Sequence, residues 1–166
     1  RVPVAQAARL AAALVELSAI VMLPPFVFAM AEAELLTTAV LGRQWAGTGE
    51  FIRLLALPML VLAATSWLDR LFDVHQRQRV ALALEGGFTV VSLAVVAALL
   101  VAGQPRIAVA VFAVGSVFYY LLYAWLAFVA NGLPRSALLR PVMLMLMLGV
   151  AAAVVCVVAA SWPSAG

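Results

Sequence analysis

Long runs without a charged residue constrain this chain more than any other feature of its sequence. Three such runs extend from Gly86 to Pro105, from Ile107 to Pro134 and from Pro141 to the last residue. A helix needs about 20 apolar residues to cross the hydrocarbon core of a bilayer. Each run is therefore long enough to span a membrane. The runs are continuous rather than alternating, which argues against the strands of a transmembrane barrel.

Two further apolar segments carry one charge each. The segment 10–31 contains Glu16, and the segment 51–68 contains Arg53 near its start. Hydrophobic residues make up 67% of the chain, well above the share in soluble domains. We therefore predict an all-α, polytopic transmembrane bundle with five crossings, in one membrane domain over 1–166. The expected helices cover about 10–31, 51–70, 80–103, 107–131 and 140–162. Arg1 opens the sequence without a methionine or the pattern of a signal peptide, so we expect a fragment of a larger protein.

The arginines predict which way the chain crosses the membrane. If successive loops alternate between the two sides, seven arginines lie on the first side and three on the second. The first group is Arg1, Arg9, Arg70, Arg77, Arg79, Arg135 and Arg140, and the second is Arg43, Arg53 and Arg106. Because basic loops resist translocation, we expect a cytoplasmic N-terminus and an outward C-terminus. The net charge of +3 then reflects loop orientation, and we expect no nucleic-acid partner.

The segment 32–50 is expected to form an outward interfacial turn. A helical face there gathers apolar residues that can lie along the membrane surface: Leu35, Leu36, Ala39 and Val40. Gly42 is expected to end this helix, because glycine tolerates a left-handed backbone. Trp45 suits the level of the lipid headgroups, where its indole N–H meets water.

The stretch "LGRQWAGTGEFIRLLALPMLVLAATSWLDRLFDVHQRQRVALALEG", from Leu41 to Gly86, resembles the C-terminal half of a polysaccharide (O-antigen type) flippase. These proteins belong to the multidrug/oligosaccharidyl-lipid/polysaccharide exporter superfamily. The resemblance extends over about Leu10 to Asn131, and Leu41 stands where the family usually has phenylalanine. The matching residues are Gly42, Trp45, Gly49, Ile52, Arg53, Leu55, Ala56, Arg77 and Gln78, with Pro24 or Pro25 in the preceding helix. The resemblance implies that the crossings correspond to the ninth to thirteenth helices of such a transporter.

The resemblance also implies a function. A flippase of this type moves a lipid-linked oligosaccharide, an undecaprenyl-diphosphate glycan, across the bacterial inner membrane by alternating access. It serves surface polysaccharide (lipopolysaccharide O-antigen) biosynthesis, and it is neither an enzyme nor a cofactor protein. Its partners would be the lipid bilayer, the N-terminal half of the same transporter, and a coupling proton or cation. The alternatives are a multidrug/cation antiporter of the same superfamily, a membrane-embedded glycan polymerase or ligase, and a purely structural membrane subunit.

Glu16 is the sharpest candidate in the first expected helix. A charge inside a membrane helix costs about 2–4 kcal/mol unless it meets partners or water. Arg9 lies seven residues earlier on the same helical face, so the pair could line a polar stripe of a substrate or ion path. The alternative is an interhelical hydrogen bond near the cytoplasmic end. Pro24 and Pro25 predict a bend, which serves either as a hinge or as a static kink.

Three residues in later helices are further candidates for the substrate or ion path. Glu85 precedes two glycines and faces either the cavity or the membrane interface. Tyr119 and Tyr123 share one face of the fourth expected helix, where they either stack on a sugar or isoprenoid or pack between helices. His75 is the single histidine of the chain, so we expect no metal site.

Overall fold

The computed structural model describes residues 4–74 and 76–161, and every long element in these ranges is a helix. The α-helices are α1 (Val4–Ala31), α2 (Ala33–Leu41), α3 (Gly49–Thr65), α4 (Asp69–Val74), α5 (Gln78–Val101), α6 (Pro105–Ala130) and α7 (Leu139–Ser161). Three short 3-10 helices connect them: η1 (Arg43–Trp45), η2 (Ser66–Leu68) and η3 (Arg135–Leu138). No strand occurs among the described residues, which confirms the predicted all-α class.

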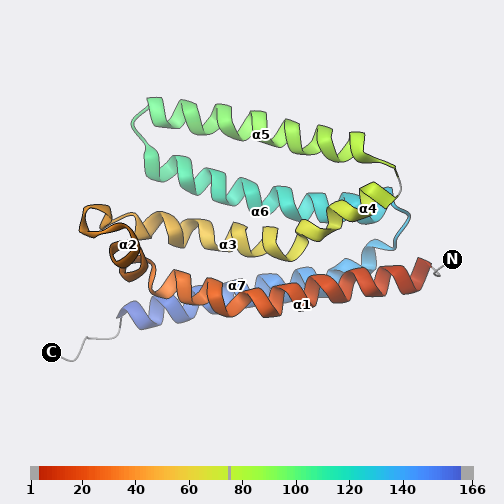
Figure 1. The fold of residues 1–166 in the computed structure, drawn as a ribbon, viewed down its shortest axis with the longest axis horizontal. Helices are drawn as coiled ribbons and strands as arrows, with labels where there is room; N and C mark the ends of the chain where they lie inside the picture. The colour runs from red at the N-terminus through yellow and green to blue at the C-terminus, as the bar shows by residue number, and fades with distance from the viewer. Residues whose placement is uncertain (1–3, 75, 162–166) are drawn as a thin grey trace.

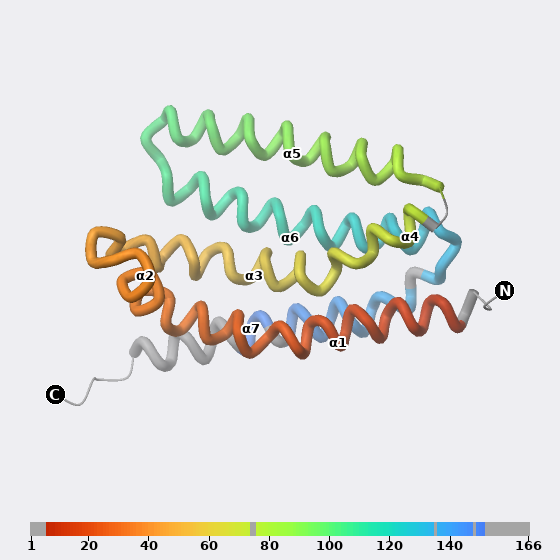
Figure 2. Tube along the Cα trace, in the orientation of Figure 1, coloured from red at the N-terminus to blue at the C-terminus, as the bar shows by residue number. Residues whose placement is uncertain are grey.

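The long helices form an antiparallel bundle (Figure 1). Helix α3 lies between α1 and α6, α7 packs beside α1, and α5 lies at the outer edge against α6. The path of the chain in Figure 2 shows α2 folded across the end of the bundle, between α1 and α3. This arrangement follows from the short connections, which place consecutive helices side by side in opposite directions.

Four helical segments are long and apolar enough to cross a membrane: Gln6–Ala31, Gly49–Asp73, Gln78–Val101 and Pro105–Ala130. The structure therefore supports a multi-pass membrane protein. The apolar helical stretch Ser136–Ala151, which extends from η3 into α7, is shorter than these spans. The fifth crossing stays a prediction.

The second span is interrupted where the sequence suggested one continuous helix over 51–70. Helix α3 ends at Thr65, the turn η2 follows, and α4 begins at Asp69. The Thr65 hydroxyl donates to the carbonyl of Val61 at 2.7 Å, and the Trp67 indole N–H donates to the carbonyl of Ala64 at 2.9 Å. Side chains that bond to backbone carbonyls compete with regular helical pairing. These two local contacts accompany the break.

Small side chains allow the helices to approach closely at the core. Helix α1 contributes Ala8, Ala11, Val15 and Ala19, and α6 contributes Ala124 and Ala127, all of them buried. Two large rings, Phe72 and Phe128, fill the space between them and are each at most 1% exposed. In a membrane the hydrophobic effect does not drive helices together, because lipid tails are themselves apolar. Close van der Waals packing of small residues stabilises the helix contacts instead. Helix α5, in contrast, buries none of its residues.

The resemblance residues around the turn between α2 and α3 have structural roles. Gly42 has a φ of 95°, in agreement with the expected left-handed backbone, and Trp45 is 48% exposed at the bundle end. Gly49 lies so close to α2 that a Cβ on it would come within 2.8 Å of the backbone nitrogen of Glu34. Arg53 donates from Nε to the carbonyl of Met30 at 3.1 Å, which satisfies an orphan carbonyl at the end of α1.

The two prolines of the first span do not interrupt it. Helix α1 continues through Pro24 and Pro25 as one element of 28 residues, and both prolines are exposed. Their role as a hinge stays a prediction.

Candidate functional site

A partly open cavity of about 420 Å³ lies between the second, third and fourth spans. Its size falls within the range of small-molecule sites, roughly 300–1,000 Å³. The lining combines carboxylates, hydroxyls and aromatic rings on an apolar wall. It consists of Leu62, Thr65, Ser66, Asp69, Glu85, Phe88, Thr89, Ser92, Leu93, Phe112, Tyr119, Tyr120 and Tyr123.

Helical periodicity explains which residues reach the cavity. On α5 the lining positions 85, 88, 89 and 92 follow the spacing i, i+3, i+4, i+7, which defines one helical face. On α6 the positions 112, 119, 120 and 123 define a second face in the same way. The break at η2 supplies the third wall, because Ser66 and Asp69 lie at its two ends. Two regular faces and one irregular turn therefore enclose the cavity.

Aromatic rings form a continuous cluster along one side of the cavity. The rings of Phe88 and Tyr119 are stacked, with centroids 4.1 Å apart and planes 7° apart. Tyr119 also contacts the rings of Tyr120 and Tyr123, at 5.3 Å and 5.8 Å between centroids. Offset and edge contacts of this kind contribute about 0.5–1.5 kcal/mol each. The stack of Phe88 on Tyr119 is the closest link between α5 and α6 in this cluster.

Asp69 and Tyr123 join the broken span to α6. The Tyr123 hydroxyl donates a hydrogen bond of 2.6 Å to Oδ1 of Asp69, and Tyr123 is 8% exposed. Such a short O–H to carboxylate distance is typical of a charge-assisted hydrogen bond. Sequence inspection singled out Tyr123 but not Asp69. The only sequence signal for Asp69 is its position where the apolar run 54–68 ends.

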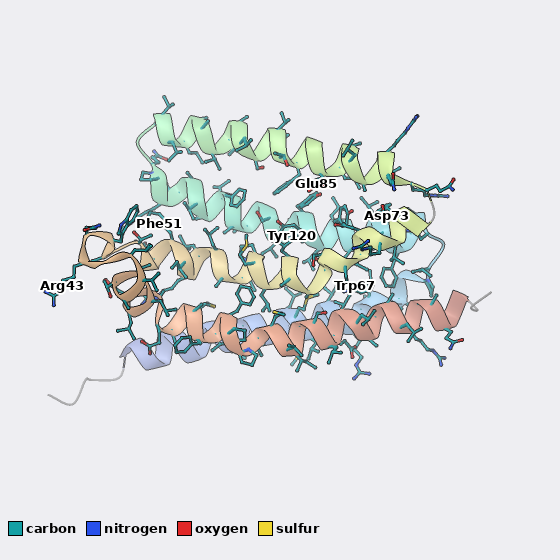
Figure 3. All side chains as sticks on the ribbon, viewed as in Figure 1. Arg43, Phe51, Trp67, Asp73, Glu85 and Tyr120 are labelled. Carbon is teal, nitrogen blue, oxygen red and sulfur yellow. The ribbon has the colours of Figure 1, made fainter. Side chains whose placement is uncertain are left out.

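Glu85 brings a second carboxylate to the cavity. It is the eighth residue of α5, about 10 Å from the start of the helix at 1.5 Å per residue. Figure 3 shows its side chain in the space between α5 and α6, where Tyr120 also lies. No hydrogen bond or ion pair joins it to another described residue, and no basic side chain lines the cavity. The cavity is therefore acidic and aromatic.

Glu16 and Arg9, the candidates on α1, lie away from this cavity. Oε1 of Glu16 forms an ion pair with Nε of Arg140 at 3.2 Å, and the Glu16 side chain is 20% exposed. Arg9 is exposed on the surface of α1 and forms no ion pair with another described residue. Glu16 therefore contacts another helix, because Arg140 belongs to α7. The sequence had placed Arg140 only among the loop arginines.

The described residues offer no arrangement suited to a resident metal ion. Among them, no three His, Cys, Asp or Glu side chains come together, and His75 lies outside the described residues.

No family model, no curated protein and no solved structure matches the chain.

Proposed function

We propose that this chain is part of a membrane transporter, a flippase that moves a lipid-linked oligosaccharide across the bacterial inner membrane. The observation that carries the proposal is the cavity between α3, α5 and α6, because it places hydroxyls and two carboxylates inside apolar spans. A polar cavity in a membrane bundle marks a substrate or ion path, since polar groups are expensive in hydrocarbon. The resemblance to polysaccharide flippases supplies the substrate class.

The distribution of arginines supports an orientation for the transporter. Figure 1 shows the N-terminus, the α4–α5 connection and the α6–α7 connection at one end of the bundle. That end carries Arg70, Arg77, Arg79 and Arg140, and the opposite end carries Arg43, Arg53 and Arg106. In the proposed orientation the first end faces the cytoplasm. The acidic part of the cavity, with Asp69 and Glu85, then lies in the cytoplasmic half of the membrane.

The proposed mechanism is alternating access. The glycan enters the polar cavity while the isoprenoid tail of the carrier stays in the bilayer. Helix α5 forms one wall and buries none of its residues, so it is the wall with the weakest attachment. Substrate or a coupling proton or cation shifts the balance between inward and outward states only if it binds one state more tightly. The N-terminal half of the transporter would complete the path.

The proposal is tested by reconstituting the full-length protein in liposomes with a fluorescent undecaprenyl-diphosphate glycan. Transfer to the opposite leaflet is measured by enzymatic or chemical quenching of the exposed glycan. The variants Asp69→Asn and Glu85→Gln are expected to slow transfer by at least tenfold. Glu50→Gln is the matched control, because Glu50 forms an exposed ion pair of 2.9 Å with Arg106, away from the cavity. Transfer no faster than in protein-free liposomes would refute the proposal.

A multidrug/cation antiporter is a second candidate, favoured by the absence of any basic side chain in the cavity lining. Two carboxylates beside aromatic rings attract organic cations. An antiporter would export a dye such as ethidium against its gradient and would leave the glycan carrier in its leaflet. The same liposomes, loaded with ethidium, separate the two functions.

A further inference from the structure

The composition of the cavity lining predicts which part of a lipid-linked glycan it can hold. Phosphate and diphosphate groups are recognised by arginine, lysine and backbone N–H groups. The lining contains none of these side chains and has two carboxylates instead, Asp69 and Glu85. A diphosphate there would face negative charge without compensation. The diphosphate must therefore bind elsewhere on the transporter.

The same lining suits a sugar ring. The faces of aromatic rings are electron-rich and attract the weakly positive C–H groups of a pyranose, while carboxylates and hydroxyls bond to its O–H groups. Here Tyr119, Tyr120 and Tyr123 lie beside Phe88, and the hydroxyls of Thr89 and Ser92 lie on the adjacent face of α5. A cavity of about 420 Å³ accommodates a monosaccharide unit. The tyrosine rings of α6 and the hydroxyls of α5 therefore line the same cavity from two walls.

Charge decides which sugars are accepted. Glu85 has no partner among the described residues, and the Asp69 carboxylate is engaged on one oxygen by Tyr123. In a partly enclosed site with an effective dielectric constant near 20, like charges a few ångströms apart repel strongly. An acidic sugar is repelled by both carboxylates, a neutral sugar is not, and an amino sugar is attracted.

We propose that this cavity binds a neutral or amino sugar of the transported glycan and excludes acidic sugars and the diphosphate. The proposal rests on the proposed flippase function and narrows its substrate. It makes Glu85 the residue that sets charge selectivity, and it makes Phe88 and Tyr119 the residues that hold the ring.

The experiment uses the full-length protein in lipid nanodiscs, because maltoside detergents carry sugar headgroups that would compete. Saturation-transfer NMR measures binding of three probes of similar size: methyl glucosaminide, methyl glucoside and methyl glucuronide. The glucosaminide is expected to bind at least tenfold more tightly than the glucuronide, with the glucoside between them. In Glu85→Gln this ratio should fall at least threefold, whereas Glu50→Gln should leave it unchanged.

The aromatic contact has its own matched pair of variants. Phe88→Leu should weaken binding of all three probes, because Phe88 stacks on Tyr119 beside the cavity. Phe118→Leu should not, because Phe118 is 76% exposed and does not line the cavity. Equal loss in both variants would overturn the proposal.

Other outcomes would also overturn the proposal and leave the flippase function intact. These are glucuronide binding as tight as glucosaminide binding, and glycan transfer in liposomes without binding of any probe. Benzyltrimethylammonium, a cation without a sugar, is the last control. Tighter binding of this ion than of the glucosaminide would assign the cavity to organic cations. Conversely, charge-ordered sugar binding without glycan transfer would refute the flippase function alone.

Discussion

The hydrogen bond from Tyr123 to Asp69 permits a quantitative test of the site. Tyr123→Phe removes only the hydroxyl, which donates to Oδ1 of Asp69 over 2.6 Å. A hydrogen bond to a charged group contributes about 1.5–3 kcal/mol to stability. Asp69 is exposed as a whole residue, so water can replace part of the lost bond. We therefore expect a loss near the lower limit, about 1.5 kcal/mol in the free energy of unfolding.

A double-mutant cycle isolates this contact. Tyr123→Phe, Asp69→Ala and the double variant are unfolded in mixed micelles of increasing SDS content, and unfolding is followed by circular dichroism. The coupling energy should be about 1–2 kcal/mol, because each single variant already breaks the same bond. Tyr120→Phe is the control, since the Tyr120 hydroxyl forms no hydrogen bond with another described residue. A coupling below about 0.5 kcal/mol would refute a bond of this strength.

Four further variants separate structural from functional roles. Gly49→Ala should destabilise the protein by about 1–3 kcal/mol, because its Cβ would lie 2.8 Å from a backbone nitrogen of α2. Gly115→Ala, where nothing lies within 4 Å, should be neutral or stabilising by up to about 1 kcal/mol in the same SDS titration. Arg53→Gln should cost about 1 kcal/mol through the lost bond to the end of α1, with unchanged glycan transfer. Glu16→Gln should cost less than about 1 kcal/mol, because its partner Arg140 is 86% exposed, and surface polysaccharide should stay normal at normal protein levels. Loss of export at normal protein levels would instead place Glu16 in the mechanism.

The sequence predicted the helical class and four of the spans because a membrane crossing depends on one segment at a time. An uncharged run such as 107–134 is long enough by itself, and α6 occupies most of it. The break between α3 and α4 was not predictable in that way. It lies inside an apolar run and coincides with bonds from Thr65 and Trp67 to particular carbonyls. The hydropathy of a segment does not predict hydrogen bonds from side chains to particular backbone carbonyls.

The candidate site was predictable in part. Helical periodicity placed Tyr119 and Tyr123 on one face, and the structure brings that face together with Glu85. Periodicity within one helix does not predict which residues of another helix its side chains contact. The same-face rule therefore suggested Arg9 as the neighbour of Glu16, whereas the ion pair in the structure is with Arg140. Asp69 was overlooked for the same reason, since its partner lies 54 residues away.

Under the proposed transport function, the unpaired charge of Glu85 links the cavity to a movement of α5. Helices separate in a bilayer without a hydrophobic penalty, because lipid tails are as apolar as leucine. Moving α5 away from α6 would instead break van der Waals contacts, among them the stack of Phe88 on Tyr119, worth about 0.5–1.5 kcal/mol. It would also bring Glu85 toward hydrocarbon, where a charged side chain costs up to about 2.5–3.5 kcal/mol at the centre of a helix. The charge thus adds to the cost of breaking the packing. A proton, a coupling cation or an amino sugar that neutralises Glu85 removes this added cost, so under the proposed mechanism occupancy of the cavity favours the movement of α5.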